Sequence, residues 1–149
     1  AFSKNKRMMY AINELNGTIT AYKYRNATTQ LLQKISTDTS NALDKGSADI
    51  HLSNDEKFLY ASNRGSYNNI AIYSIDDLGK LKFIALQSTL GKTPRNFVID
   101  PTDNFLLVAN QNSDNIIVFK RNKETGLLQE TGVEIKVGTP VCLQMIEVE

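Results

Sequence analysis

Hydrophobic residues along the chain fall into short runs, separated by polar clusters that are typical of turns. The runs are rich in Ile, Val, Tyr and Phe, and no stretch sustains the period of a helix. Three runs line up as repeats, because each ends in Asn and they begin 50 and 47 residues apart: 8–13, 58–63 and 105–110. A second β-rich run follows each of them after a short polar loop. The pattern predicts an all-β chain built from repeated strand pairs.

The last two repeats are longer and hold four predicted strands each. An apolar run precedes the Asn-ending run at 49–52 and at 96–99, and a turn leads into one more strand downstream. Four strands that recur every 40 to 50 residues, roughly, are typical of a β-propeller blade. The sequence therefore predicts these units: an incomplete blade at about 8–37 that lacks its innermost strand, blades at about 47–89 and 94–136, and a lone closing strand at about 140–148.

About three blades are too few to close a ring, since propellers have about four to eight. An open ring leaves two blade faces in water. If each face hides roughly 600 Å² of apolar surface, exposing both costs on the order of 30 kcal/mol, more than the typical stability of a domain. We therefore expect the chain to be the C-terminal part of a larger propeller, whose missing blades come from the rest of the polypeptide or from self-association.

Composition and charge exclude several classes of partner. The 17 basic and 16 acidic residues leave a formal charge of +1, so no broad basic surface for nucleic acid is expected. No apolar run approaches the roughly 20 residues that span a bilayer. Because Cys142 and His51 are the single cysteine and histidine, neither an intrachain disulfide nor a Cys/His metal cluster can form. We expect Cys142 to be a buried, inert thiol.

As a set, the repeats resemble the lactonase-type seven-bladed β-propellers, which include bacterial 6-phosphogluconolactonases and fungal carboxymuconate cyclases. The resemblance covers nearly the whole chain and implies a cytoplasmic enzyme that hydrolyses a sugar-acid lactone, such as 6-phosphogluconolactone, without metal or other cofactor. Its substrate would be a small anionic lactone or carboxylate. The segments that carry the resemblance are 48–53, 58–65, 93–97 and 108–116.

This sequence departs from the family pattern at two points. A Pro-Arg-His motif that precedes Glu14 in full-length members is absent from these residues. Arg95 keeps a Pro-Arg pair but is followed by Asn96, where many members carry His. Part of the family's site is therefore missing here, and we expect little or no turnover from this segment alone.

The position after each repeated Asn is the strongest candidate for a site, because it carries Glu14, Arg64 and Gln111 in the three copies. Equivalent positions lie on one face of a ring, where ligand-lining residues can differ from blade to blade. Glu14, in an Asn-Glu-Leu motif that the family shares, is the candidate general base. Arg64 would hold an anion or stabilise an oxyanion, and Gln111 would bind substrate hydroxyls. The structural alternatives are an exposed loop carboxylate, an ion pair between blades and a loop cap.

Two further residues are candidates for substrate binding. Arg95 begins a predicted innermost strand, from which its guanidinium can reach the channel and bind a phosphate or carboxylate. His51 lies between Ile50 and Leu52 and therefore points to the opposite face of its strand. A structural role against the next blade is favoured for His51, and a part in substrate binding or catalysis stays open.

Two other functions remain as alternatives. The same glutamate and arginines could close a lactone ring on a carboxylated diene, as in a 3-carboxy-cis,cis-muconate cyclase. A propeller can also serve as a non-catalytic interaction platform. A protein-binding face would be enriched in aromatic anchors, and Tyr67 is the lone aromatic residue near the candidate positions. The enzyme hypothesis is therefore favoured.

Overall fold

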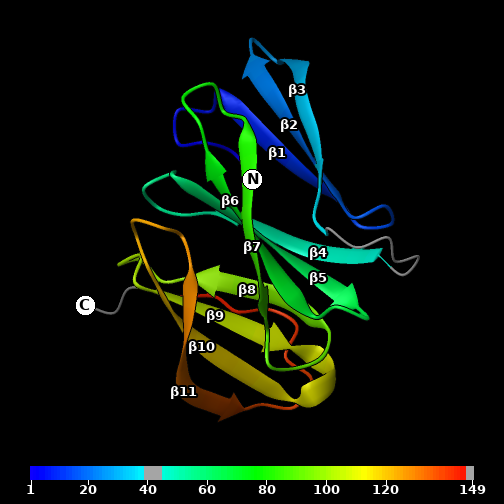
Figure 1. Ribbon diagram of the computed structural model, residues 1–149, viewed down its shortest axis with the longest axis vertical. Coiled ribbons are helices and arrows are strands. Elements are labelled where there is room, and N and C mark those ends of the chain that lie inside the picture. The colour runs from blue at the N-terminus through cyan, green and yellow to red at the C-terminus, as the bar shows by residue number, and fades with distance from the viewer. Residues whose placement is uncertain (39–44, 147–149) are drawn as a thin grey trace.

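The computed structural model describes residues 1–38 and 45–146, where eleven strands form three antiparallel sheets stacked along the long axis (Figure 1). In each sheet the strands pair in the order of the sequence, so the predicted all-β propeller fold is confirmed. Blade A contains β1 (Met8–Asn13), β2 (Thr18–Arg25) and β3 (Thr28–Ser36). Blade B contains β4 (Lys45–Leu52), β5 (Phe58–Gly65), β6 (Asn69–Ile75) and β7 (Leu81–Ser88). Blade C contains β8 (Pro94–Ile99), β9 (Phe105–Asn110), β10 (Asn115–Arg121) and β11 (Leu128–Lys136).

The two ends of the described chain are less regular than the blades. Blade A has three strands, and beside β1 Phe2 forms an isolated antiparallel bridge with Met9 while the Tyr10 N–H donates to the Ala1 carbonyl at 2.8 Å. The prediction missed this pairing since Ala1–Ser3 is too short to show a pattern. At the other end, residues 140–146 belong to no strand. A closing strand there stays a prediction for a complete ring.

Two hydrophobic cores lie between the blades. Leu59 belongs to the core between blades A and B, and the next residue, Tyr60, belongs to the core between blades B and C. Successive side chains of a strand point to opposite faces of its sheet. A blade that is covered on both faces therefore needs apolar residues at consecutive positions, which explains why the runs in the sequence do not alternate with polar residues.

A tyrosine on β1 of blade A and one on β5 of blade B each bond to a turn of the next blade. The hydroxyl groups of Tyr10 and Tyr60 donate to the carbonyls of Gly79 and Gly126 at 3.0 and 2.8 Å. Burial is the largest cause that raises the pKa of each tyrosine to about 12. Both glycines have a positive φ, of 82° and 76°. The two bonds occupy equivalent positions in the repeat, so this contact is a repeated feature of the blade junctions.

The repeated Asn reaches in the other direction, to the blade before it. The Asn63 amide donates to the Thr37 carbonyl at 2.8 Å, and the Asn110 amide donates to the Thr89 carbonyl at 3.0 Å. The side-chain oxygen of Asn63, Oδ1, accepts a bond from the Ser47 hydroxyl. Pro94 faces Asn110 where Ser47 faces Asn63, and Asn110 Oδ1 is left without a partner among the described residues. The repeated Asn of blades B and C therefore has a structural role, since in each case its amide bonds to the end of the preceding blade.

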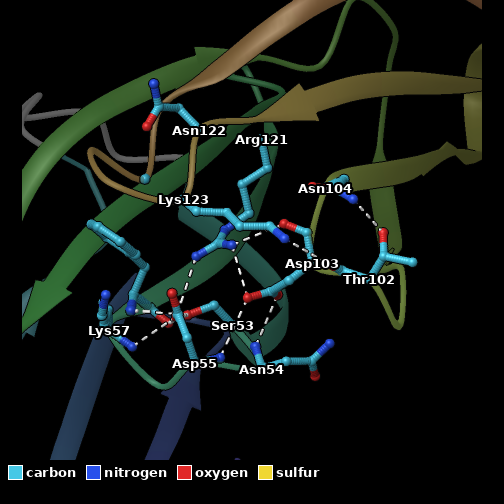
Figure 2. A network of polar contacts seen from close by, with 12 residues as sticks. Ser53, Asn54, Asp55, Lys57, Thr102, Asp103, Asn104, Arg121, Asn122 and Lys123 are labelled. Carbon is cyan, nitrogen blue, oxygen red and sulfur yellow. Dashed lines mark hydrogen bonds and ion pairs between the residues drawn. The ribbon is translucent and has the colours of Figure 1, made fainter.

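A buried arginine joins blades B and C near the start of β5 (Figure 2). The fully buried Arg121 side chain pairs with Asp103 at 2.9 Å and with Asp55 at 3.4 Å, and its Nε donates to the Tyr60 hydroxyl. Its guanidinium also lies over the Phe58 ring, 5.4 Å from the centroid. A buried charge is tolerated only when it is paired and hydrogen-bonded in this way. The network therefore links the turn before β5 in blade B to blade C.

We predict that Gly126→Ala destabilises the intact protein more than Gly132→Ala. Both glycines have φ of 76°, so either alanine costs roughly 1 to 2 kcal/mol of backbone strain. A Cβ on Gly126 would also lie 2.4 Å from the Phe58 ring of the preceding blade, whereas a Cβ on Gly132 meets no described atom within 4 Å. Denaturant unfolding should show a further loss of about 1 to 3 kcal/mol for Gly126→Ala. Equal losses would contradict a tight contact between these blades.

Candidate active site

One small pocket receives side chains from all three blades. It measures about 230 Å³ and lies at the ends of the strands opposite to the Arg121 network, because β5 runs from Phe58 beside Arg121 to Arg64 at the pocket. The structure thus brings together three of the residues that the sequence singled out. The pocket is lined by Glu14, Ala48, Asp49, Arg64, Arg95, Asn96 and Val141.

Glu14 and Arg64 form an ion pair across the junction of blades A and B. The Arg64 side chain is mostly buried, with 19% exposed, and its Nε also donates to the Gly46 carbonyl at 3.4 Å. The Glu14 backbone carbonyl accepts a bond from the Ser47 N–H, which ties the loop after β1 to blade B. Arg64 therefore makes the ion pair between blades that the sequence offered as an alternative, and it also lines the pocket, where binding of an anion stays a prediction.

Arg95 stands apart from this pair. It is exposed, and its side chain makes no hydrogen bond or ion pair with any residue that the structure describes. Pro94 pairs with Asn110 and Asn96 pairs with Ala109, so Arg95 occupies a bulge between them. A bulge changes the direction in which a side chain points. The pocket therefore contains one arginine that is paired with a carboxylate and one that is available to an anion.

Asp49 is a pocket residue that sequence reasoning missed. Its carboxylate accepts bonds from the Asn96 amide at 2.6 Å, the Phe97 N–H at 3.1 Å and the Ile50 N–H at 2.9 Å. Burial alone would raise the pKa of the Asp49 carboxyl, but the hydrogen bonds and the contact with His51 together lower it below its ordinary value. The one available signal was its position, 47 residues before Asn96 on the equivalent strand.

The other two predicted site residues lie outside this pocket. His51 Nε2 is 3.0 Å from Asp49 Oδ2, and its ring packs edge-on against Phe97 of blade C with the centroids 4.8 Å apart. This contact favours the structural role for His51. Gln111 starts the short 3-10 helix Gln111–Ser113, and its backbone N–H donates to the Thr93 carbonyl.

The expectation of a buried Cys142 is wrong, because the thiol is exposed. Its segment pairs with no strand in the part of the chain that the structure describes, and Cys142 is left exposed beside β8. Within residues 1–38 and 45–146, no three His, Cys, Asp or Glu side chains group closely enough to hold a metal ion. No helix in these ranges has the length and apolar character needed to cross a membrane.

Comparison with known proteins identifies the family. The model of the seven-bladed β-propeller lactonases matches residues 1–145, and the chain belongs to this family. It is 46% identical over 146 residues to a 6-phosphogluconolactonase of Formosa agariphila, and 34% identical over 151 residues to that of Bacillus subtilis. These alignments cover 97% and 98% of this chain but 41% and 43% of the relatives. The chain thus spans about two fifths of their length.

A solved structure agrees with the architecture. The periplasmic gluconolactonase of Pseudomonas aeruginosa superimposes with a TM-score of 0.96 at 33% sequence identity. The match covers 100% of this chain and 42% of that protein. The arrangement of the three blades is therefore that of a known lactonase propeller.

We predict that Asp49 stabilises the intact protein in a pH-dependent way. Because its folded pKa is lowered, its contribution is present above the unfolded value of about 3.9 and is lost as the pH falls through the folded value. Urea unfolding should show Asp49→Asn to be about 1 to 3 kcal/mol less stable than the wild type near neutral pH. The difference should shrink toward about pH 3.

The control is Asp77→Asn, since Asp77 is exposed and its side chain bonds to none of the described residues. It should change stability little at either pH. A penalty for Asp49→Asn that is the same in acid and at neutral pH would contradict the role assigned to the ionised carboxylate.

Proposed function

We propose that the intact protein is a lactonase that opens a sugar-acid lactone, and that its substrate is 6-phosphogluconolactone. The observation that carries the proposal is the meeting of Glu14, Arg64 and Arg95 in one pocket, although each comes from a different blade. Two relatives named 6-phosphogluconolactonase support the choice of substrate. Sugar-acid lactones are esters, so their opening needs an activated water, a site for the developing oxyanion and, for this substrate, a site for phosphate.

The three side chains have chemistry that fits these needs. Glu14 takes a proton from the water as the oxygen attacks the lactone carbonyl carbon. Arg64 keeps its Nη1 donors free of the described residues, and these stabilise the oxyanion. When the bond from the carbonyl carbon to the ring oxygen breaks, Glu14 returns the proton to that oxygen. Arg95 binds the phosphate group, for which a guanidinium is well suited.

The cyclase alternative would use the same residues to form a lactone. The names of the two curated relatives favour hydrolysis, and assays with both substrates would separate the two reactions. The cytoplasmic location stays a prediction. A periplasmic relative at 33% identity makes the other compartment a concrete alternative, which fractionation of cells that express the intact protein would decide.

We predict that Glu14→Gln in the intact protein lowers kcat for lactone hydrolysis by about 100-fold or more, because the amide cannot accept the proton of the attacking water. The measurement is the rate of lactone disappearance, corrected for uncatalysed opening. Glu124→Gln is the matched control, since Glu124 is an exposed carboxylate on a turn of blade C. If Glu14→Gln kept the wild-type kcat, another residue would have to be the base.

We predict that Arg95→Gln raises KM for the phosphorylated lactone about tenfold and changes KM for unphosphorylated gluconolactone much less. A lost charged contact with phosphate costs binding only when the phosphate is present. Arg25→Gln is the control, because Arg25 is an exposed arginine at the end of β2, away from this pocket. Equal effects on both substrates would show that Arg95 does not bind the phosphate.

A further inference from the structure

The backbone around Arg95 is irregular, and so is the backbone around Asp49. In blade B, Ser47 pairs with Asn63 and Ile50 pairs with Ala61, which leaves Ala48 and Asp49 in a bulge that lines the pocket. Arg95 occupies the corresponding bulge of blade C. No hydrogen bond or ion pair with the described residues holds its guanidinium, so its direction depends on what holds the backbone of β8.

Asp49 holds that backbone from the neighbouring blade. One carboxylate oxygen accepts bonds from both residues that follow Arg95, the Asn96 amide at 2.6 Å and the Phe97 N–H at 3.1 Å. The carboxylate is itself fixed by the Ile50 N–H and by His51, and the Asp49 N–H donates to the Ser62 hydroxyl. A bulge that is gripped immediately after its extra residue has little freedom to change its direction.

The same contact extends to the wall of the pocket. Because the Asn96 amide group donates to Asp49, its oxygen is turned toward the Leu143 N–H, from which it accepts a bond at 2.6 Å. Leu143 follows Val141 closely in the segment that lines the pocket. Asp49 thus fixes the orientation of Asn96 as well as the start of β8.

We infer that Asp49 is a positioning residue for Arg95: its carboxylate locks the bulge of β8 across the blade junction and so presents the guanidinium to the anionic group of the substrate. The inference deepens the proposed function and rests on it for the identity of the ligand. Asp49 itself is not assigned a step in lactone opening.

Positioning and simple electrostatics predict opposite results for Asp49→Asn. If Asp49 acted only through its negative charge, its removal would strengthen the binding of an anion to Arg95. If it positions Arg95, the variant loses a shared acceptor, the bulge relaxes and anion binding weakens. The effect must then depend on the presence of Arg95.

The test is a double-mutant cycle in the intact protein, with the dissociation constant of 6-phosphogluconate measured by calorimetry. Asp49→Asn should weaken binding about tenfold, the effect of losing a hydrogen bond to a charged group, but should have little further effect when Arg95→Gln is already present. In the hydrolysis assay it should raise KM and leave kcat nearly unchanged. Hydrogen exchange of the Phe97 backbone amide should be faster in Asp49→Asn than in the wild type, because that amide donates to Asp49.

Two further variants keep the test decisive. Asn96→Ala removes one of the two links without changing Asp49, and should show the same dependence on Arg95 if Asp49→Asn does not fold. Asp100→Asn is the matched control, because Asp100 also accepts backbone bonds but lies at the far end of β8. Burial raises the pKa of Asp100, but the bond from the Thr102 hydroxyl and the backbone bonds together lower it below its ordinary value. The Asp100→Asn variant should change stability without changing the dissociation constant.

The possible failures are distinguishable. Tighter or unchanged binding in Asp49→Asn, or an equal loss of affinity with and without Arg95, would overturn the positioning role even if the wild type hydrolyses the lactone. Wild-type binding of 6-phosphogluconate without hydrolysis would overturn the proposed function and leave the cycle valid. A wild type that does not bind 6-phosphogluconate would overturn both.

Discussion

The structure depends on side chains that cross from one blade to a backbone group of the next. Asn63 reaches the Thr37 carbonyl, Tyr60 reaches the Gly126 carbonyl, and Asp49 reaches the Phe97 N–H. Hydrophobic burial between sheets has no direction, so it cannot by itself fix how one blade is rotated against another. Hydrogen bonds to the backbone can fix it, because they are directional, and those made by the Tyr and Asn side chains recur at both junctions between the three blades. The pocket exists only if these rotations are fixed.

The bond at the innermost strands shows this recurrence most clearly. The Phe97 N–H donates to Asp49, and the Leu143 N–H donates to Asn96. The segment at the end of the described chain therefore lies against blade C as β8 lies against blade B, although it pairs with no strand among residues 1–38 and 45–146. The contact at the innermost strands of blades B and C is therefore repeated between blade C and this segment, whose Val141 lines the pocket.

Repeats in the sequence were enough to predict the all-β fold, and the position after the repeated Asn located Glu14 and Arg64 in one pocket. Asp49 and Arg121 were not predicted, because their roles depend on a strand bulge and on partners from another blade that no local pattern encodes. Cys142 was misjudged since an apolar segment was assumed to be covered. In physical terms, periodicity reports which face of a strand is buried, whereas bulges and contacts between blades are set only when the sheets come together.

The most direct test of this account is a crystal structure of the intact protein with 6-phosphogluconate bound. The account predicts that the phosphate lies within hydrogen-bond distance of the Arg95 guanidinium and that the carboxylate lies between Glu14 and Arg64. A ligand bound at the opposite ends of the strands, or a structure in which these three side chains do not share one pocket, would contradict it.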